Sequence, residues 1–346
     1  MPTISIEEEC TNIGKGATVV IWYDPKDEPP DLTLALTAEM SRSAFGGSTM
    51  SEFNRGISDK FIDQLREEAK KESWWADVIN DPKLFVAVRE ESLNVYWHGQ
   101  SLFRVKPGPK VTTHAKFLLD PELDDQVPLV EREFNIGELQ ERGFISQYTG
   151  TKTLTKMKKA SGLFAGLEKT GCHEIGVNNP EVIDCEIAFG GNKKGAPRAD
   201  IATLEQGNGG DAHLVFWEAK HYSNPELRAE DGRPIPVCDQ VRRYKEYLFD
   251  IDHRKAVVTS YKRVAENLVA IRDMGMQRPL SSLITEVGTG KRLLTLDPET
   301  KVGLIIFGFD QAEKVHPGWK HHLERLKSEI KPVVDVGSAK GIRLKT

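Results

Sequence analysis

The sequence predicts an α/β protein in which a mixed central sheet is flanked by helices, preceded by an α+β N-terminal module. Two patterns lead to this prediction. In the second half, three apolar strand-like segments are followed by two helical segments and another apolar strand, an order typical of a sheet covered by helices. In the first half, apolar residues at helical spacing precede a stretch in which apolar and polar residues alternate.

The N-terminal module is expected to cover residues 1–120 and has no predicted role. Within it, the apolar spacing over 57–79 predicts an amphipathic helix. The alternation over 84–106, broken at EES and HGQ, predicts three short strands. The acidic segment 118–128 contains two prolines and is the expected linker to a second domain over 130–346.

The second domain holds the predicted central sheet. Three strands are expected over 181–189, 198–205 and 212–220, joined by turns rich in Gly and Asn, as hairpins require. A lysine-rich helical segment that ends near residue 170 precedes them. The elements expected after them are helices over about 236–251 and 254–274, a buried strand over 301–309 and a last helix over about 318–330.

Composition excludes several classes of protein. The formal net charge of −5 and the pI near 6.0 exclude an overall basic nucleic-acid-binding surface, although a local basic patch stays open. The N-terminus shows no signal segment, and the most apolar run, 302–309, is too short to span a bilayer. The four cysteines form no CxxC pair, so we expect reduced thiols in a cytoplasmic protein without a membrane partner. These cysteines are Cys10, Cys172, Cys185 and Cys238.

The stretch LVFWEAK, residues 214–220, ends an apolar strand in two charges, which are costly to bury. Because strand side chains alternate, Glu218 and Lys220 share one face, and Asp200 can lie beside them if the two strands pair. Neighbouring carboxylates repel each other unless a cation neutralises them, and oxygen ligands favour Mg²⁺ or Mn²⁺. Such a cation can activate water and stabilise charge on a phosphate, while a lysine positions or deprotonates the water or neutralises the transition state. The pattern therefore favours phosphodiester hydrolysis.

This arrangement resembles the PD-(D/E)xK nuclease superfamily. The resemblance is carried by PRAD with Asp200, by EAK with Glu218 and Lys220, and by QVRRY on the next predicted helix. The last of these is similar to the Q-x(3)-Y element of the RecB-like branch. Pro197 does not directly precede the aspartate, a departure that the family tolerates. The resemblance covers about residues 130–250 and implies a restriction-endonuclease-like fold there.

The resemblance also implies roles for individual residues at the strand ends. Asp200, Glu218 and the backbone carbonyl of Ala219 would be ligands of Mg²⁺ or Mn²⁺. Lys220 would act on the attacking water. DNA would be the substrate.

Further site residues would come from helices. Gln240 and Tyr244 are four residues apart, so they share one helix face and would help to hold the site or the DNA. The family often adds an acid from its first core helix. Here Glu138 is preferred, because its helix offers apolar anchors, and Glu168 and Glu186 stay open. The four-cysteine iron–sulfur cluster of some RecB-like exonucleases is missing, which argues against the CRISPR-associated and helicase-linked members that carry it.

The same residues also have purely structural interpretations. Glu218 and Lys220 can form an exposed salt bridge at a strand end, with Asp200 a surface acid near a turn. The lysines before the first strand can meet phosphates or face solvent. Tyr96 and Trp97 can stack on a base or pack as cross-strand aromatics.

The functional expectation is a metal-dependent DNA nuclease acting in restriction, phage defence or repair, by analogy with the family. The alternative is a catalytically inactive nuclease fold that binds nucleic acid, or a scaffolding subunit of a larger, helicase-containing complex. A third option is a nuclease held inactive until a partner releases it. The sequence carries no ATPase motif, so a helicase or sensor partner would supply any motor. A homodimer is also compatible with the sequence.

Overall fold

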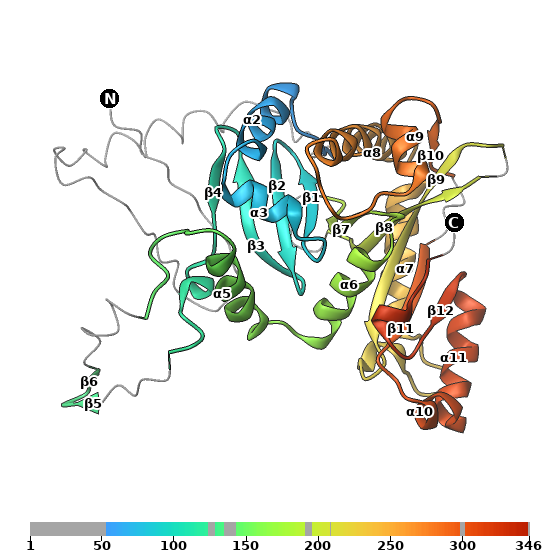
Figure 1. Cartoon of the computed structure of the whole chain (residues 1–346). Coiled ribbons are helices and arrows are strands. Elements are labelled where there is room, and N and C mark those ends of the chain that lie inside the picture. Colours follow the sequence, from blue (N-terminus) through green and yellow to red (C-terminus); the bar gives the residue numbers. More distant parts are fainter. Residues whose placement is uncertain are drawn as a thin grey trace, which may run out of the picture. The chain divides into compact units, whose positions relative to one another are not determined.

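The computed structural model of the chain describes residues 53–123, 129–134, 143–190, 196–207, 209–297 and 302–344. These described residues belong to one unit and are drawn in colour in Figure 1. Glu138, the preferred additional acid, lies outside the described residues. The boundary near residue 120 stays a prediction, because the segments before and after this module include residues outside the described part.

The central sheet is six-stranded and mixed, with the order β12-β11-β9-β8-β7 and β10 paired to β9. Strands β7, β8 and β9 are antiparallel neighbours, whereas β11 runs parallel to both β9 and β12. The predicted α/β class with a mixed central sheet is therefore confirmed. The strands are β7 (Val182–Ala188), β8 (Arg198–Gln206), β9 (Ala212–His221), β10 (Leu294–Thr295), β11 (Val302–Phe307) and β12 (Val333–Asp335).

Helices cover both faces of this sheet. Helices α7 and α8 share one hydrophobic cluster with it, and α6 contributes to a second cluster on the opposite face. No helix in the described part of the chain is long and apolar enough to cross a membrane. The helices of this region are α5 (Thr151–Gly162), α6 (Leu167–Asn178), α7 (Pro236–Phe249), α8 (Ile251–Arg272), α9 (Ser282–Gly288), α10 (Gln311–Val315) and α11 (Pro317–Glu329).

A second, antiparallel sheet of four strands in the order β1-β2-β3-β4 precedes the central one. The three strands predicted over 84–106 are confirmed, and a fourth short strand follows them. The single helix predicted over 57–79 is wrong, because Ser73 caps a new helix by accepting a hydrogen bond from the backbone of Ala76. The elements are α2 (Asp59–Ala69), α3 (Trp74–Asn80), β1 (Phe85–Arg89), β2 (Ser92–Trp97), β3 (Gln100–Lys106) and β4 (Lys110–Thr112), followed by the short hairpin β5 (Leu129–Val130) and β6 (Glu133–Phe134).

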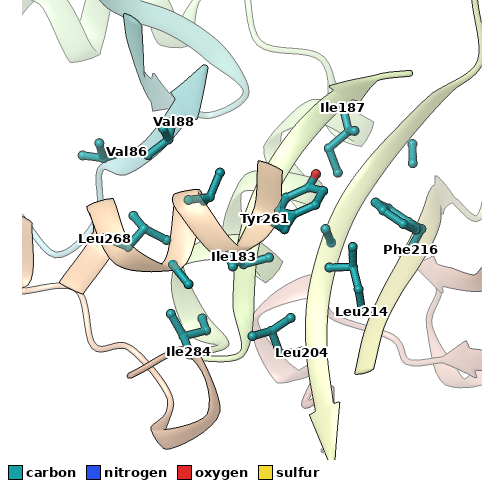
Figure 2. Close-up of a cluster of buried hydrophobic side chains, with 14 of the residues drawn as sticks. Val86, Val88, Ile183, Ile187, Leu204, Leu214, Phe216, Tyr261, Leu268 and Ile284 are labelled. Carbon is teal, nitrogen blue, oxygen red and sulfur yellow. The ribbon is translucent and has the colours of Figure 1, made fainter. Parts of the chain in front are cut away.

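Side-chain alternation along β9 divides the core. Leu214 and Phe216 face the cluster that includes Tyr261 of α8, and the rings of Phe216 and Tyr261 are 6.0 Å apart (Figure 2). Val215 and Trp217 face the cluster that includes α6. The strand is thus buried on both faces, as its apolar run predicts, and the even-numbered residues lie on the α7 and α8 side.

A buried carboxylate connects the two sheets. Asp184 of β7 has no exposed surface. Its oxygens lie 2.6 Å from Nη1 of Arg89 on β1 and 3.2 Å from Nε of Arg55. Tyr261 of α8 donates its hydroxyl to the same carboxylate over 3.1 Å, and the backbone N–H of Cys185 donates over 2.8 Å. One charge therefore joins four segments that are distant in sequence.

Replacing this carboxylate with an amide is expected to destabilise the protein strongly. In Asp184→Asn the shape of the side chain is kept, but two buried guanidinium groups lose their counter-charge. Breaking a buried ion pair in this way costs about 3–5 kcal/mol, and denaturant unfolding of the purified protein measures the loss. The matched control is Asp239→Asn, whose exposed pair with Arg242 is expected to contribute less than about 1 kcal/mol. Equal, small losses in the two variants would contradict the role of Asp184.

Candidate active site

The candidate site lies at the carboxyl end of β9. Glu218 and Lys220 follow Phe216 on the α7 side of the strand. Parallel pairing with β11, in which Leu304 lies opposite Glu218, shields the strand on its other edge. Glu218 is only 3% exposed and Lys220 only 6%. The interpretation of these two residues as an exposed salt bridge is therefore wrong, because both charges are buried.

Three acids lie in one row across the neighbouring strands. The last registered pair of β8 and β9 joins Ile201 to Trp217, so the next position sets Asp200 opposite Glu218. On the other side, the β7–β8 register sets Glu186 opposite Asp200. The Oδ2 atom of Asp200 accepts a hydrogen bond of 2.8 Å from the backbone N–H that follows Glu218. The structure thus brings Asp200 beside the EAK stretch.

Glu186 differs from the other two acids. Its side chain is exposed, and its φ of +54° lies in the left-handed region, which L-residues rarely adopt. Such a conformation is strained and persists where the surrounding structure imposes it. Glu186 is therefore held at the edge of the acid row, facing solvent.

Lys220 is held by carboxylates on several sides. Its Nζ atom lies 2.8 Å from Glu218 Oε1, 2.8 Å from Glu226 Oε2 and 3.7 Å from Glu168 Oε1. Because burial of an ammonium group is costly unless it is paired, these contacts explain how a lysine can end a core strand.

Glu226 is a member of the site that the sequence did not predict. It lies in a short 3₁₀ turn, Pro225–Leu227, that follows β9 directly. Asn224 and Pro225 form an Asn-Pro pair, which is typical of a turn. This signal could have predicted that the chain turns back toward Lys220. Nothing in the spacing identifies which side chain of the turn reaches Lys220.

The two residues of the QVRRY element both point at the site from α7, as their spacing predicts. Tyr244 donates its hydroxyl to Glu218 Oε2 over 2.6 Å. Gln240 instead donates its Nε2 to Glu226 Oε2 over 3.0 Å. They share one helix face but hold different carboxylates.

Glu168 also reaches the site. Its Oε2 accepts hydrogen bonds from Asn224 Nδ2 over 2.7 Å and from the backbone N–H of His221 over 3.4 Å. It lies in the first turn of α6 and not near the end of one lysine-rich helix, because Gly166 begins a new helix after α5. A side chain on Gly171 would have its Cβ 2.1 Å from the ring of Phe307, so only glycine lets α6 pack this closely on β11.

Two lysines of α5 pair with carboxylates of preceding segments. Lys156 lies 2.6 Å from Asp120, and Lys158 lies 2.6 Å from Asp81. Lys158 also sits 3.8 Å from the ring centre of Trp97. Their charges are thus used within the fold.

Burial and like charges raise the pKa values of Asp200 and Glu218. Burial, followed by the charge of Glu218, raises the pKa of Asp200 well above its usual value. Burial also raises the pKa of Glu218, although its bonds to Lys220 and Tyr244 oppose that shift. For Lys220, burial alone would lower the pKa, but the charge of Glu218 and the hydrogen bonds to Glu218 and Glu226 outweigh it, and the pKa is raised. Lys220 is thus an ammonium ion at neutral pH.

Asp200, Glu218 and the Ala219 carbonyl offer oxygen donors, the type of ligand that a hard divalent cation prefers. After burial, the negative charge of Glu218 is the next cause of the raised pKa of Asp200, and a cation between the two carboxylates would relieve that repulsion. The hydrogen bond from its own N–H to Asp200 places Ala219 next to both carboxylates, so its carbonyl is a candidate third oxygen donor. Within the described residues, no group of three or more His, Cys, Asp or Glu side chains is arranged to hold a metal ion.

The raised pKa of Asp200 predicts a stability change that depends on pH. A carboxyl group with a raised folded-state pKa binds its proton more tightly in the folded chain, so its ionisation opposes folding above its unfolded pKa of about 3.9. In EDTA, Asp200→Asn is therefore expected to unfold with a higher free energy than the parent at pH 7. The difference should shrink as the pH falls toward about 4.

Denaturant unfolding across this pH range measures the effect. The exposed control Asp63→Asn should show no such trend. A parent protein that is more stable than Asp200→Asn at every pH would contradict the predicted repulsion.

The resemblance to the PD-(D/E)xK superfamily rests on Asp200, on Glu218 with Lys220, and on Gln240 with Tyr244. No protein-family model, curated protein or solved structure matches this chain. Membership of the superfamily is therefore a proposal.

Proposed function

We propose that this protein is a metal-dependent DNA nuclease of the PD-(D/E)xK type, with a restriction-endonuclease-like core. The observation that carries the proposal is the buried pair Glu218 and Lys220 at the end of β9, with the partly buried Asp200 of β8 beside it and Tyr244 of α7 hydrogen-bonded to Glu218. Buried, closely paired charges with shifted pKa values are more frequent at functional sites than elsewhere.

The order of elements supports the proposed fold. Helix α6 precedes the antiparallel strands β7, β8 and β9, and α7 follows directly. Asp200 lies on β8, Glu218 and Lys220 lie near the end of β9, and Gln240 and Tyr244 lie on α7. The resemblance implies this order of elements for the motif. Glu168, from the helix before the first strand, would be the additional acid of the family, in place of Glu138.

Individual residues would perform distinct steps. Asp200, Glu218 and the Ala219 carbonyl would hold Mg²⁺ or Mn²⁺, which lowers the pKa of a bound water and stabilises charge on the phosphate. Lys220, as an ammonium ion, would donate hydrogen bonds to the attacking water or the phosphate and neutralise developing charge. Its raised pKa favours these roles over proton abstraction. Tyr244 would orient the Glu218 carboxylate through the 2.6 Å hydrogen bond.

The deep burial of Glu218 and Lys220 favours one second candidate. A nuclease kept closed until a helicase or sensor partner engages it would show such limited exposure. In that case the isolated chain would bind DNA weakly and cleave it slowly, and a partner would raise the rate.

Cleavage of plasmid and linear DNA tests the proposal. The parent is expected to cleave in Mg²⁺ or Mn²⁺ and to stop in EDTA. Glu218→Gln and Lys220→Met should each lose about a hundredfold or more of the rate, as removal of one charge-stabilising group typically does. Lys255→Met, which changes an exposed lysine paired with Asp252, is the control and should keep the parent rate.

Two other results would contradict the proposal. Equal cleavage by the parent and both site variants would point to a contaminating nuclease. DNA binding in EDTA, measured by fluorescence anisotropy, without cleavage in either metal would instead favour an inactive, nucleic-acid-binding subunit.

A further inference from the structure

We propose that Glu226 is a positioning residue of the site, and that Gln240 acts through it to hold Lys220. The proposal rests on the proposed nuclease function. Lys220 Nζ lies as close to Glu226 Oε2 as to Glu218 Oε1, at 2.8 Å in both cases. The same Oε2 atom of Glu226 accepts the 3.0 Å hydrogen bond from Gln240 Nε2. A continuous chain of contacts therefore runs from α7 through the turn to the lysine.

The turn that carries Glu226 is fixed by its own contacts. The backbone N–H of Glu226 donates to Asn224 Oδ1 over 2.9 Å, and the neighbouring Leu227 is fully buried. Arg228 donates to the carbonyls of Tyr222 and Asn224 over 2.7 and 3.2 Å. A carboxylate on so constrained a turn has few other positions to occupy, which is the requirement for positioning another side chain.

Arg228 is itself anchored by aromatic rings. Its guanidinium carbon lies 4.6 Å from the ring centre of Tyr222 and 5.0 Å from that of Trp319 in α11. These two rings meet edge to face, with centres 4.8 Å apart. The C-terminal region thus supports the turn from outside, although none of its residues carries the proposed chemistry.

The same turn fixes a second carboxylate. Asn224, whose Oδ1 caps Glu226, uses its Nδ2 to donate to Glu168 Oε2 over 2.7 Å. One amide side chain thereby sets the relative positions of the two partly exposed acids that flank Lys220. Their exposed fractions are 36% for Glu168 and 38% for Glu226, so both carboxylates are partly open to solvent.

With Glu226 in place, one carboxylate can hold a cation while another pairs with Lys220, which Glu218 alone cannot do. A cation held by Glu218 would draw on the same carboxylate that pairs with Lys220. Glu226 is absent from the proposed metal ligands, so it can keep its contact with the ammonium group. Lys220 would then stay aimed at the phosphate, and loss of this hold would lower kcat more than substrate affinity.

Kinetics of single and double variants test the inference. Glu226→Gln keeps the shape of the side chain and removes its charge, and Gln240→Ala removes the link to α7. Each is expected to lower kcat about tenfold to a hundredfold, the usual loss for a residue that orients a site group from outside, with KM within about twofold of the parent. The double variant should be no worse than the poorer single variant, because both act through one contact.

The matched control is Glu230→Gln, which changes an exposed acid near the same turn that pairs with Arg233. It should keep the parent kcat. The melting temperature of each variant shows whether a lower kcat comes from lost positioning or from a lost fold. Glu226→Gln and Gln240→Ala are expected to have a lower kcat but the same melting temperature as the parent.

Three outcomes would overturn the inference. These are an unchanged kcat in Glu226→Gln, additive losses in the double variant, or a higher kcat, which would mean that Glu226 competes with substrate for Lys220. If the parent protein cleaves no DNA in any metal, the proposed nuclease function itself is contradicted. If the parent cleaves DNA and Glu226→Gln has the same kcat, only the proposed role of Glu226 is contradicted.

Discussion

The buried carboxylate of Asp184 is the constraint on which the rest of the structure depends. It lies in β7, at the far edge of the central sheet from β12, where the antiparallel sheet and helix α8 both meet it. Burying one negative charge requires counter-charges, and Arg55 and Arg89 come from segments that precede the central sheet in the chain. The register of β7 against β8 sets Glu186 opposite Asp200, so the strand that carries this ion pair also carries the outermost acid of the row.

The site repeats the same principle with the signs reversed. At Asp184, two cations and two neutral donors surround one anion, whereas at Lys220 three carboxylates surround one cation. In the first group the carboxylate is fully buried, and the side chains of Arg55 and Arg89 are 6% and 14% exposed. The second keeps the partly exposed acids Glu168 and Glu226 and includes Glu218, whose pKa is raised mainly by burial. That excess of negative charge is unfavourable for folding alone and suits a cationic ligand.

Much of this could be predicted from the sequence, for identifiable reasons. The apolar run of β9 and the glycine-rich turns before it place Asp200 beside Glu218, because strand alternation and hairpin pairing are local rules. The spacing of Gln240 and Tyr244 fixes their shared helix face in the same way. Glu226 was not predicted, and Glu168 stayed one of three candidates for the additional acid, because the approach of both to Lys220 depends on tertiary packing. The break between α5 and α6 lies between Gly162 and Gly166, and these glycines are a helix-end signal that the expectation of one lysine-rich helical segment overlooked.

Gly171 sets the spacing between α6, the helix that carries Glu168, and β11. The gap between α6 and Phe307 admits a hydrogen atom and no carbon, since a Cβ there would come within 2.1 Å of the ring. No side chain is intermediate in size between hydrogen and methyl, so substitution at this position cannot adjust the reach of Glu168 in small steps. Gradual change in that reach has to come from the ring opposite, through the size of the residue at 307. A gradual change in the distance between Glu168 and Lys220 would therefore come from the residue at position 307 in the sheet, and not from position 171 in the helix that carries Glu168.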